Sequence, residues 1–217
     1  MLRNKSCDAI ELSALRPNEL QPLIAALNTL DLNKFAIISF HAPSKVDPAL
    51  EQETTQLLVQ VARKGWIIVV HPDAITDFDL WRQLGPSLAL ENMDKRKPIG
   101  RYAHELASLL QHLPQAGFCF DIGHARQVDP SMAEAGTILR QFRDRLRLIH
   151  ISEVNSQSKH DPISLTAFLA FQKITHLIPD DVPVIIESKV TEDQIEREVE
   201  TVADLLPARN RAMLAGD

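Results

Sequence analysis

The chain has 217 residues, of which 45% are hydrophobic and 24% charged, a balance typical of one globular domain spanning residues 1–217. Its formal net charge of -6 argues against nucleic acid or an anionic membrane as a partner, because phosphate binding depends on clustered Lys and Arg. Two cysteines are too few for a disulfide framework, and the sequence shows neither a signal peptide nor a membrane-spanning apolar stretch. We therefore expect a reduced, cytoplasmic protein.

Short apolar runs that predict buried strands alternate along the chain with segments of helical periodicity. Strands are expected, in chain order, at residues 10–15, 35–40, 66–70, 88–90, 118–120, 146–149 and 182–186. Helices are expected at residues 17–30, 47–65, 77–84, 98–113, 129–146, from 161 onward, and 191–206. Three of these helices begin with an Asp-Pro pair, which predicts N-cap aspartates at Asp47, Asp129 and Asp161.

Six of the seven apolar runs end in a side chain that can bind a metal or carry a proton. These strand-end residues are His41, His71, Glu91, Asp121, His150 and Glu187. Their spacing matches one βα unit at each step, and continuous apolar strands between helices favour a parallel sheet of the α/β class. In a TIM-type (β/α) barrel such strand ends converge on one mouth. A doubly wound sheet would not bring six of them together, and no Gly-rich phosphate-binding motif follows the first strand.

Alternation within the strands also favours a barrel. Residues two positions before each strand-end residue are smaller on balance and suit a crowded lumen: Ser39, Val69, Ala89, Cys119, Leu148 and Ile185. The alternate positions suit contact with the surrounding helices: Phe40, Val70, Leu90, Phe120, Ile149 and Ile186. With seven strands, the barrel is expected to be incomplete. The N-terminal segment or a partner chain, as in a homodimer, would cover its open edge.

The motifs at the strand ends resemble those of the xylose isomerase-like TIM barrels, a superfamily that contains endonuclease IV and many sugar isomerases and epimerases. They read Phe40-His41, Val70-His71-Pro72, Leu90-Glu91-Asn92-Met93, Phe120-Asp121-Ile122-Gly123-His124, Ile149-His150-Ile151-Ser152 and Ile186-Glu187-Ser188. Ile10-Glu11-Leu12 resembles the second strand of the superfamily, so the missing βα unit would be the first. The same scaffold hosts different reactions, and the motifs alone do not choose among them.

The isomerase and epimerase members imply one divalent metal on residues matching Glu91, Asp121, His150 and Glu187. In that reading Glu91 and Glu187 are catalytic and exchange a proton with a small sugar or sugar phosphate through an enediolate, while the metal polarises the carbonyl. The ligand types are compatible with manganese, zinc, magnesium or cobalt.

The endonuclease IV members imply two or three metals and a phosphoester hydrolase instead. There, residues matching His41 and His71 join Glu91 at another metal, and one matching His124 contributes to a third. The other third-metal ligands form an Asp-x-His pair, whereas this chain reads Lys159-His160-Asp161-Pro162, which departs from that pattern. A non-catalytic metal-binding barrel with an interaction role is the remaining alternative.

Other polar residues near the expected mouth are candidates for substrate binding. Lys95, with Arg96 and Lys97, could hold a phosphate or carboxylate, although such a short run is typical of a solvated loop. Arg126 and Lys159 have similar status, and His160 is a further substrate-binding candidate. Glu11 would either line the mouth or pair with a helix or loop. Gly123 is expected to turn the chain into a loop that presents His124.

Overall fold

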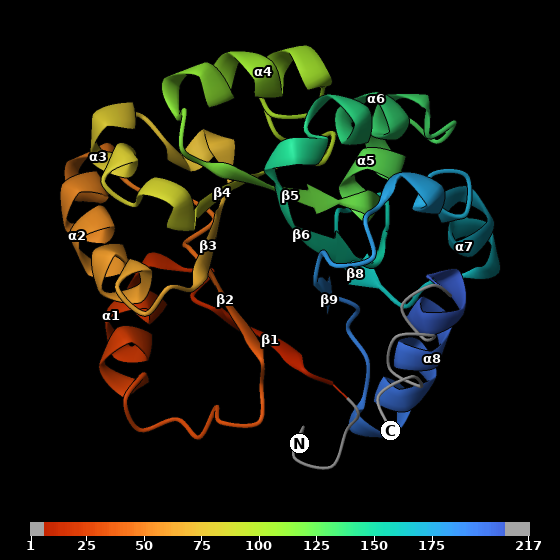
Figure 1. Ribbon diagram of the computed structural model, residues 1–217, viewed down its shortest axis with the longest axis horizontal. Coiled ribbons are helices and arrows are strands. Elements are labelled where there is room, and N and C mark those ends of the chain that lie inside the picture. Colours follow the sequence, from red (N-terminus) through yellow and green to blue (C-terminus); the bar gives the residue numbers. More distant parts are fainter. Residues whose placement is uncertain (1–6, 207–217) are drawn as a thin grey trace.

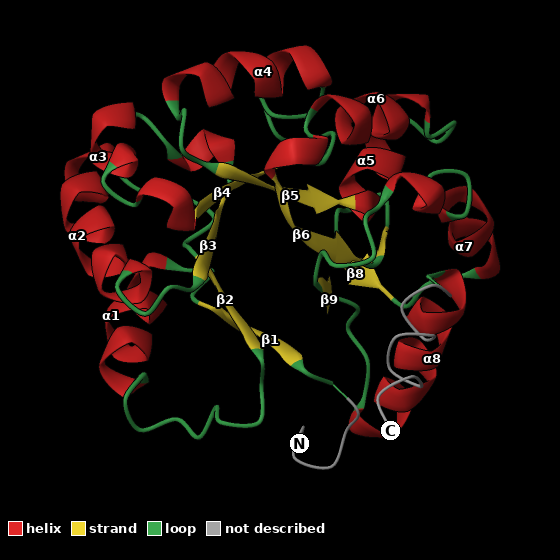
Figure 2. Ribbon diagram, in the orientation of Figure 1, coloured by secondary structure: helices red, strands yellow, loops and turns green. Residues whose placement is uncertain are grey.

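The computed structural model describes residues 7–206. In them, seven parallel strands in the order β1-β2-β3-β4-β5-β6-β9 curl into a nearly closed barrel with the helices outside (Figures 1 and 2). The strands are β1 (Ala9–Ser13), β2 (Ile37–His41), β3 (Ile67–Val70), β4 (Leu88–Glu91), β5 (Gly117–Asp121), β6 (Leu146–Ile151) and β9 (Val184–Ile186). This architecture confirms the incomplete TIM-type α/β barrel that the sequence predicts.

The helices cover the outer face of the sheet, and a small hairpin lies apart from it. The helices are α1 (Pro17–Ala26), α2 (Glu51–Ala62), α3 (Phe78–Arg82), α4 (Ala103–His112), α5 (Ile122–Val128), α6 (Ala133–Gln141), α7 (Leu165–Phe171) and α8 (Ile195–Leu205). The antiparallel hairpin pairs β7 (Glu153–Val154) with β8 (His160–Asp161). No helix among residues 7–206 is long and apolar enough to cross a membrane.

Only one Asp-Pro pair opens a helix as predicted. Asp47 accepts a hydrogen bond from the Ala49 amide at the start of a short 3-10 turn that leads into α2. The N-cap prediction for Asp161 is wrong, because this residue pairs within the hairpin and α7 is capped by Ser164, whose Oγ accepts from the Ala167 amide. Asp129 forms the turn before α6, which begins only at Ala133.

Two predicted helices are shorter than expected at their ends. The segment 98–113 becomes helical only at Ala103, because Gly100 adopts a left-handed φ of 88° and Tyr102 is extended. The segment 129–146 yields α6 followed by a separate 3-10 turn at Arg143–Arg145. Both changes lie outside the strands and leave the barrel unaltered.

The apolar side chains form two separate clusters, one on each face of the sheet. The cluster inside the barrel consists of Val69, Ala89, Cys119, Leu148 and Ile185. The larger cluster between sheet and helices includes Phe40, Val70, Leu90, Phe120 and Ile149. The predicted division of each strand into a lumen face and a helix face is therefore confirmed. The lumen cluster forms the floor beneath the strand ends.

The barrel is open along one seam. β1 and β9 are the two ends of the strand order, so in the described sheet each has one hydrogen-bonded neighbour, although they approach one another. A cavity of about 300 Å³ lies at this seam and is lined by β1, β9 and α8, including Ile10, Ile186 and Val199. The sheet thus keeps its barrel curvature without full closure.

Candidate metal centre

The strand order brings the predicted strand-end residues to one mouth. His41, Glu91 and Asp121 are the last residues of β2, β4 and β5, and His150 lies one position before the end of β6. His71 and Glu187 directly follow β3 and β9. Two groups of these side chains place one ligand atom each within 4.8 Å of one another: Glu91, Asp121, His150 and Glu187; and His41, His71 and Glu91. Glu91 belongs to both groups.

The four-residue group is arranged around His150. Its Nδ1 lies 3.3 Å from Oε1 of Glu91 and 3.3 Å from Oε1 of Glu187. Asp121 pairs with His150 in the register of β5 and β6, which sets these two residues side by side. Because the four side chains come from the neighbouring strands β4, β5, β6 and β9, the sheet itself fixes their spacing.

Glu11, on β1 across the seam from β9, orients the His150 ring. Nε2 of His150 lies 3.2 Å from Oε2 of Glu11, which also accepts a hydrogen bond of 2.8 Å from Ser39 Oγ. Both ring nitrogens of His150 thus face carboxylates, which only accept, and in the metal-free site each nitrogen can donate a proton. A metal on Nδ1 would displace the proton there, while Nε2 would keep its proton for Glu11. This is the arrangement by which a carboxylate fixes a metal-binding histidine. The sequence left the role of Glu11 open.

Two carboxylate oxygens of this group are buried without a hydrogen bond from any described residue. They are Oδ2 of Asp121 and Oε2 of Glu187. The nearest imidazole nitrogens, His124 Nδ1 and His160 Nδ1, each lie 3.3 Å away but form no hydrogen bond to them. Burying a carboxylate oxygen without a partner is costly. A divalent cation would satisfy both oxygens, so these residues fit a metal.

The two glutamates of the group differ in their affinity for a proton. Burial raises the pKa of Glu187 well above its ordinary value, and the neighbouring charges of Asp121 and Glu91 raise it further. Burial also acts to raise the pKa of Glu91, but hydrogen bonds from histidines, His150 first, outweigh it and hold the pKa well below the usual range. Two carboxyl groups whose pKa values are shifted in opposite directions in this way can serve as an acid and a base.

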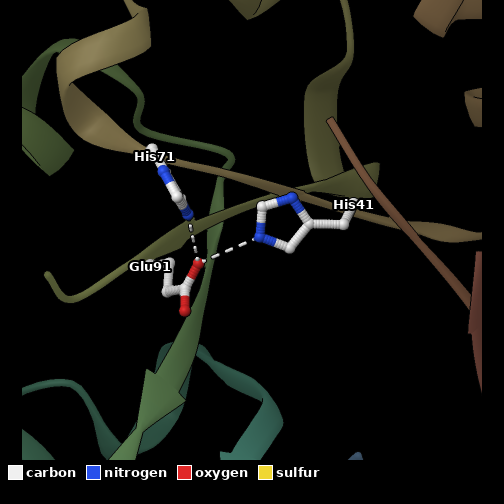
Figure 3. A group of neighbouring side chains, drawn as sticks. All are labelled: His41, His71 and Glu91. Carbon is white, nitrogen blue, oxygen red and sulfur yellow. Dashed lines mark hydrogen bonds and ion pairs between the residues drawn. The ribbon is translucent and has the colours of Figure 1, made fainter. Parts of the chain in front are cut away.

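The second group centres on the other oxygen of Glu91. Figure 3 shows His41 and His71 both pointing at Glu91. Nε2 of His41 lies 3.3 Å from Oε2 of Glu91, and Nε2 of His71 lies 3.2 Å from the same oxygen. His41 is buried, whereas the His71 side chain retains 12% exposure toward the mouth. The sequence predicted these residues as ligands of an additional metal, and the structure places them together.

Asp121 is held in place by its backbone and by the helix that follows. The Asn92 side chain donates to the Asp121 carbonyl and accepts from its amide, both at 2.8 Å. Oδ1 of Asp121 accepts from the His124 amide and caps α5. The expected loop at Gly123 is thus a helical turn. A Cβ at Gly123 would lie 2.5 Å from the Ser152 carbonyl oxygen, so the close packing requires glycine.

His124 and His160 lie beside the four-residue group but outside both ligand sets. His124 Nδ1 donates to the Asn92 carbonyl oxygen at 3.0 Å. His160, on β8, has Nδ1 2.8 Å from Ser152 Oγ, and its ring faces that of His124 with centroids 5.5 Å apart. The predicted third-metal role of His124 would have to use its other nitrogen.

The other two substrate-binding candidates lie in different surroundings. Arg126 forms an ion pair of 3.0 Å with Glu153, the first residue of the hairpin. Lys95 is exposed in the loop after β4, where its amide donates to the side chain of Gln127. Of the three predicted substrate-binding residues, His160 is the one in contact with a member of the four-residue group, Glu187.

Comparison with known proteins adds information at the level of the fold. No protein-family model matches the sequence, and no curated protein matches it. Among solved structures, endonuclease IV from Thermus thermophilus matches with a TM-score of 0.61 and 19% identity, over 90% of this chain and 84% of that one.

Two further solved structures match over a similar length. A xylose isomerase-like TIM barrel protein from Mycobacterium smegmatis, in complex with magnesium, has a TM-score of 0.56 and 12% identity, over 92% of this chain and 85% of that one. A candidate sugar phosphate isomerase/epimerase from Anabaena variabilis has a TM-score of 0.50 and 17% identity, over 92% of this chain and 76% of that one. The chain therefore has the fold of the xylose isomerase-like TIM barrels.

Proposed function

We propose that this protein is a divalent-metal-dependent isomerase or epimerase of a small sugar or sugar phosphate. One observation carries the proposal: Asp121 and Glu187, each with a buried oxygen that accepts no hydrogen bond from the described residues, place a ligand atom within 4.8 Å of ligand atoms of Glu91 and His150. Three carboxylates and one imidazole are ligands that suit a single divalent cation. The similarity to enzymes of isomerase and endonuclease types supports an enzyme with this fold.

The two glutamates are placed for proton transfer. Each has Oε1 3.3 Å from Nδ1 of His150, so they flank a common point, and Glu187 is the more accessible, with 20% of its side chain exposed. A divalent cation bound there would polarise a substrate carbonyl and the adjacent hydroxyl. Glu187 would remove the proton from the carbon that carries the hydroxyl, next to the carbonyl, to give an enediolate. Glu91 or Glu187 would then return a proton to the former carbonyl carbon in an isomerase, or to the opposite face of the same carbon in an epimerase.

The remaining expectations complete this proposal. His160, beside Glu187, would contact the substrate hydroxyls. Lys95 would reach a phosphate only after the loop that follows β4 moves, and Arg126, on α5, only after its ion pair with Glu153 opens. Manganese, zinc, magnesium and cobalt all suit the ligand types. A homodimer would cover the seam between β1 and β9, and we propose a small-molecule substrate and a cytoplasmic setting.

The second candidate is a multinuclear phosphoester hydrolase of the endonuclease IV type. The observation that favours it is the position of His41 and His71, whose Nε2 atoms both approach Oε2 of Glu91 (Figure 3). Metal content separates the candidates: one metal per chain favours the isomerase, and two or three favour the hydrolase. Absence of metal binding would rule out both enzymes.

The decisive test is proton exchange with Glu187→Gln. A panel of aldoses, ketoses and their phosphates in deuterated water, with manganese added, should show deuterium entering one sugar carbon with the wild-type protein. Loss of Glu187 as base should slow this exchange roughly 10²–10⁴-fold, the usual contribution of a general base. Glu192→Gln, at an exposed glutamate just beyond β9, is the matched control and should exchange normally. Equal exchange in both variants would refute the proposed role.

A further inference from the structure

The two histidines that point at Glu91 differ in which ring nitrogen carries the proton. Nδ1 of His41 lies 2.8 Å from the Ala42 carbonyl oxygen. A carbonyl only accepts, so Nδ1 of His41 is protonated, and any proton that Nε2 donates to Glu91 can be displaced by a metal to leave a neutral ring with its proton on Nδ1. His41 can thus reach the tautomer that a metal ligand needs.

His71 is in the opposite situation because its Nδ1 faces a cation. Nζ of Lys97 lies 3.3 Å from Nδ1 of His71. An ammonium group only donates, so Nδ1 of His71 must accept. The proton of the neutral ring then lies on Nε2, 3.2 Å from Oε2 of Glu91, where it can be donated to the carboxylate.

The ammonium group of Lys97 is firmly anchored. It lies 2.8 Å from both carboxylate oxygens of Asp73 and 3.4 Å from the Ser44 carbonyl oxygen. The side chains of Lys97 and Asp73 are only 17% and 14% exposed, which limits the screening of this ion pair by water. Lys97 therefore stays beside His71 and is not a free phosphate-binding residue.

A metal on Nε2 of His71 would have to displace the proton from that nitrogen. The proton would move to Nδ1, toward an ammonium group that offers no acceptor, and the metal would add a second cation nearby. We infer that Lys97 holds His71 as a hydrogen-bond donor to Glu91 and thereby excludes a second metal from the group formed by His41, His71 and Glu91. Lys97 is then a positioning residue that sets the metal count at one. The inference rests on the proposed one-metal centre and refines it.

Metal counting in matched lysine variants tests this inference. Zinc is added stepwise to chelator-treated full-length protein, and the bound metal is counted by mass spectrometry after desalting. Wild type should retain one zinc per chain, and Lys97→Met should retain two. Its second zinc should bind roughly 10-fold or more tightly than any second zinc in wild type, the size of effect usual for groups around metal ligands. Adding His71→Ala to Lys97→Met should return the count to one.

Two controls keep the test decisive. Lys95→Met removes an exposed lysine from the same loop and should leave the count at one. Asp73→Asn combined with Lys97→Met avoids leaving an unpaired carboxylate and should also bind two zinc ions. A wild-type count of two that falls to one on His71→Ala, or a count of one in both Lys97 variants, would overturn the inference.

Nitrogen-15 NMR of the His71 ring in metal-free protein provides a readout independent of metal binding. We expect the Nε2–H tautomer in wild type and a loss of that preference in Lys97→Met. The Nδ1–H tautomer in wild type would overturn the inference directly. If wild type binds no metal at all, the proposed function fails, while the tautomer of His71 still decides whether Lys97 acts on it.

Discussion

Carboxylates are buried at several places in this barrel, and two of these places differ in how the oxygens are paired. Glu51, the first residue of α2, is 1% exposed. Its Oε1 accepts from the Thr76 amide and from Trp81 Nε1, both at 2.7 Å, while the Thr76 hydroxyl donates to Oε2 and the Asp77 amide approaches both oxygens. Every donor is a neutral group supplied by one short segment after β3.

The mouth of the barrel shows the contrary pattern. Asp121 and Glu187 each keep a buried oxygen without a hydrogen bond from the described residues, and other carboxylates lie nearby. A carboxylate whose oxygens are fully hydrogen-bonded leaves no position for a ligand, and Glu51 serves to link α2 to the segment from Thr76 to Trp81. Buried carboxylates whose oxygens lack hydrogen bonds are costly to the fold, and such a group suits a cation. Hydrogen bonding, more than burial, distinguishes the structural acid Glu51 from the candidate metal ligands.

The largest effect on stability is expected from Glu51→Ala. This change leaves the Trp81 Nε1 group and two backbone amides without their acceptor in a buried site. We expect a loss of about 3 kcal/mol in the free energy of unfolding, because buried donors without partners are destabilising. Urea unfolding measures it, and metal content should stay at the wild-type value. A loss of bound metal would contradict the separation between the two sites.

A slightly smaller effect on the free energy of unfolding is expected from metal binding. A divalent cation at 100 times its Kd should stabilise the wild-type fold by about 2.7 kcal/mol, if it binds only the folded chain. Asp121→Asn removes one charge from the four-residue group and should lose most of this stabilisation, whereas Glu51→Gln should retain it. Thermal unfolding at increasing manganese concentration measures both. Equal stabilisation of Asp121→Asn and wild type would place the metal elsewhere.

The smallest effect is a pH dependence specific to Glu51. Burial acts to raise its pKa, but hydrogen bonds, those from Thr76 first, lower the pKa below the ordinary value of 4.5. The stabilisation is therefore complete above the pKa of the unfolded chain and is lost as the pH falls through the lower folded value. The difference in free energy of unfolding between wild type and Glu51→Gln should shrink from pH 5 toward about pH 3. A difference that grows on acidification would reverse the assigned direction.

The sequence was sufficient to predict the barrel because residues that face the lumen alternate with residues that face the helices along its strands. Val69 and Val70 look alike in composition, yet their positions relative to His71 assign one to the lumen and the other to the helix face, as the structure shows. Parallel pairing then brings the strand ends to one mouth, so the ligand candidates follow from order along the chain alone.

Contacts between loops were beyond the reach of such patterns. Asp161 precedes a proline just as Asp47 does, but its segment pairs in a hairpin whose strands have only two residues each. Strands this short have no periodicity that a sequence pattern could detect. Lys97 stands in a run of three basic residues, a pattern typical of a solvated loop. Its contacts with Asp73 and His71 join residues that are 24 and 26 positions apart and depend on the loop's path.

The open seam between β1 and β9 has a consequence for how the barrel tolerates an incomplete ring. Glu91, Asp121, His150 and Glu187 all belong to the uninterrupted arc from β4 to β9, so no pairing between their strands crosses the seam. Widening or narrowing of the seam would alter the lumen near Glu11 while leaving the spacing of these four residues unchanged. The barrel can therefore lack one βα unit at the seam without separating these four residues, whereas a break between β5 and β6 would separate Asp121 from His150.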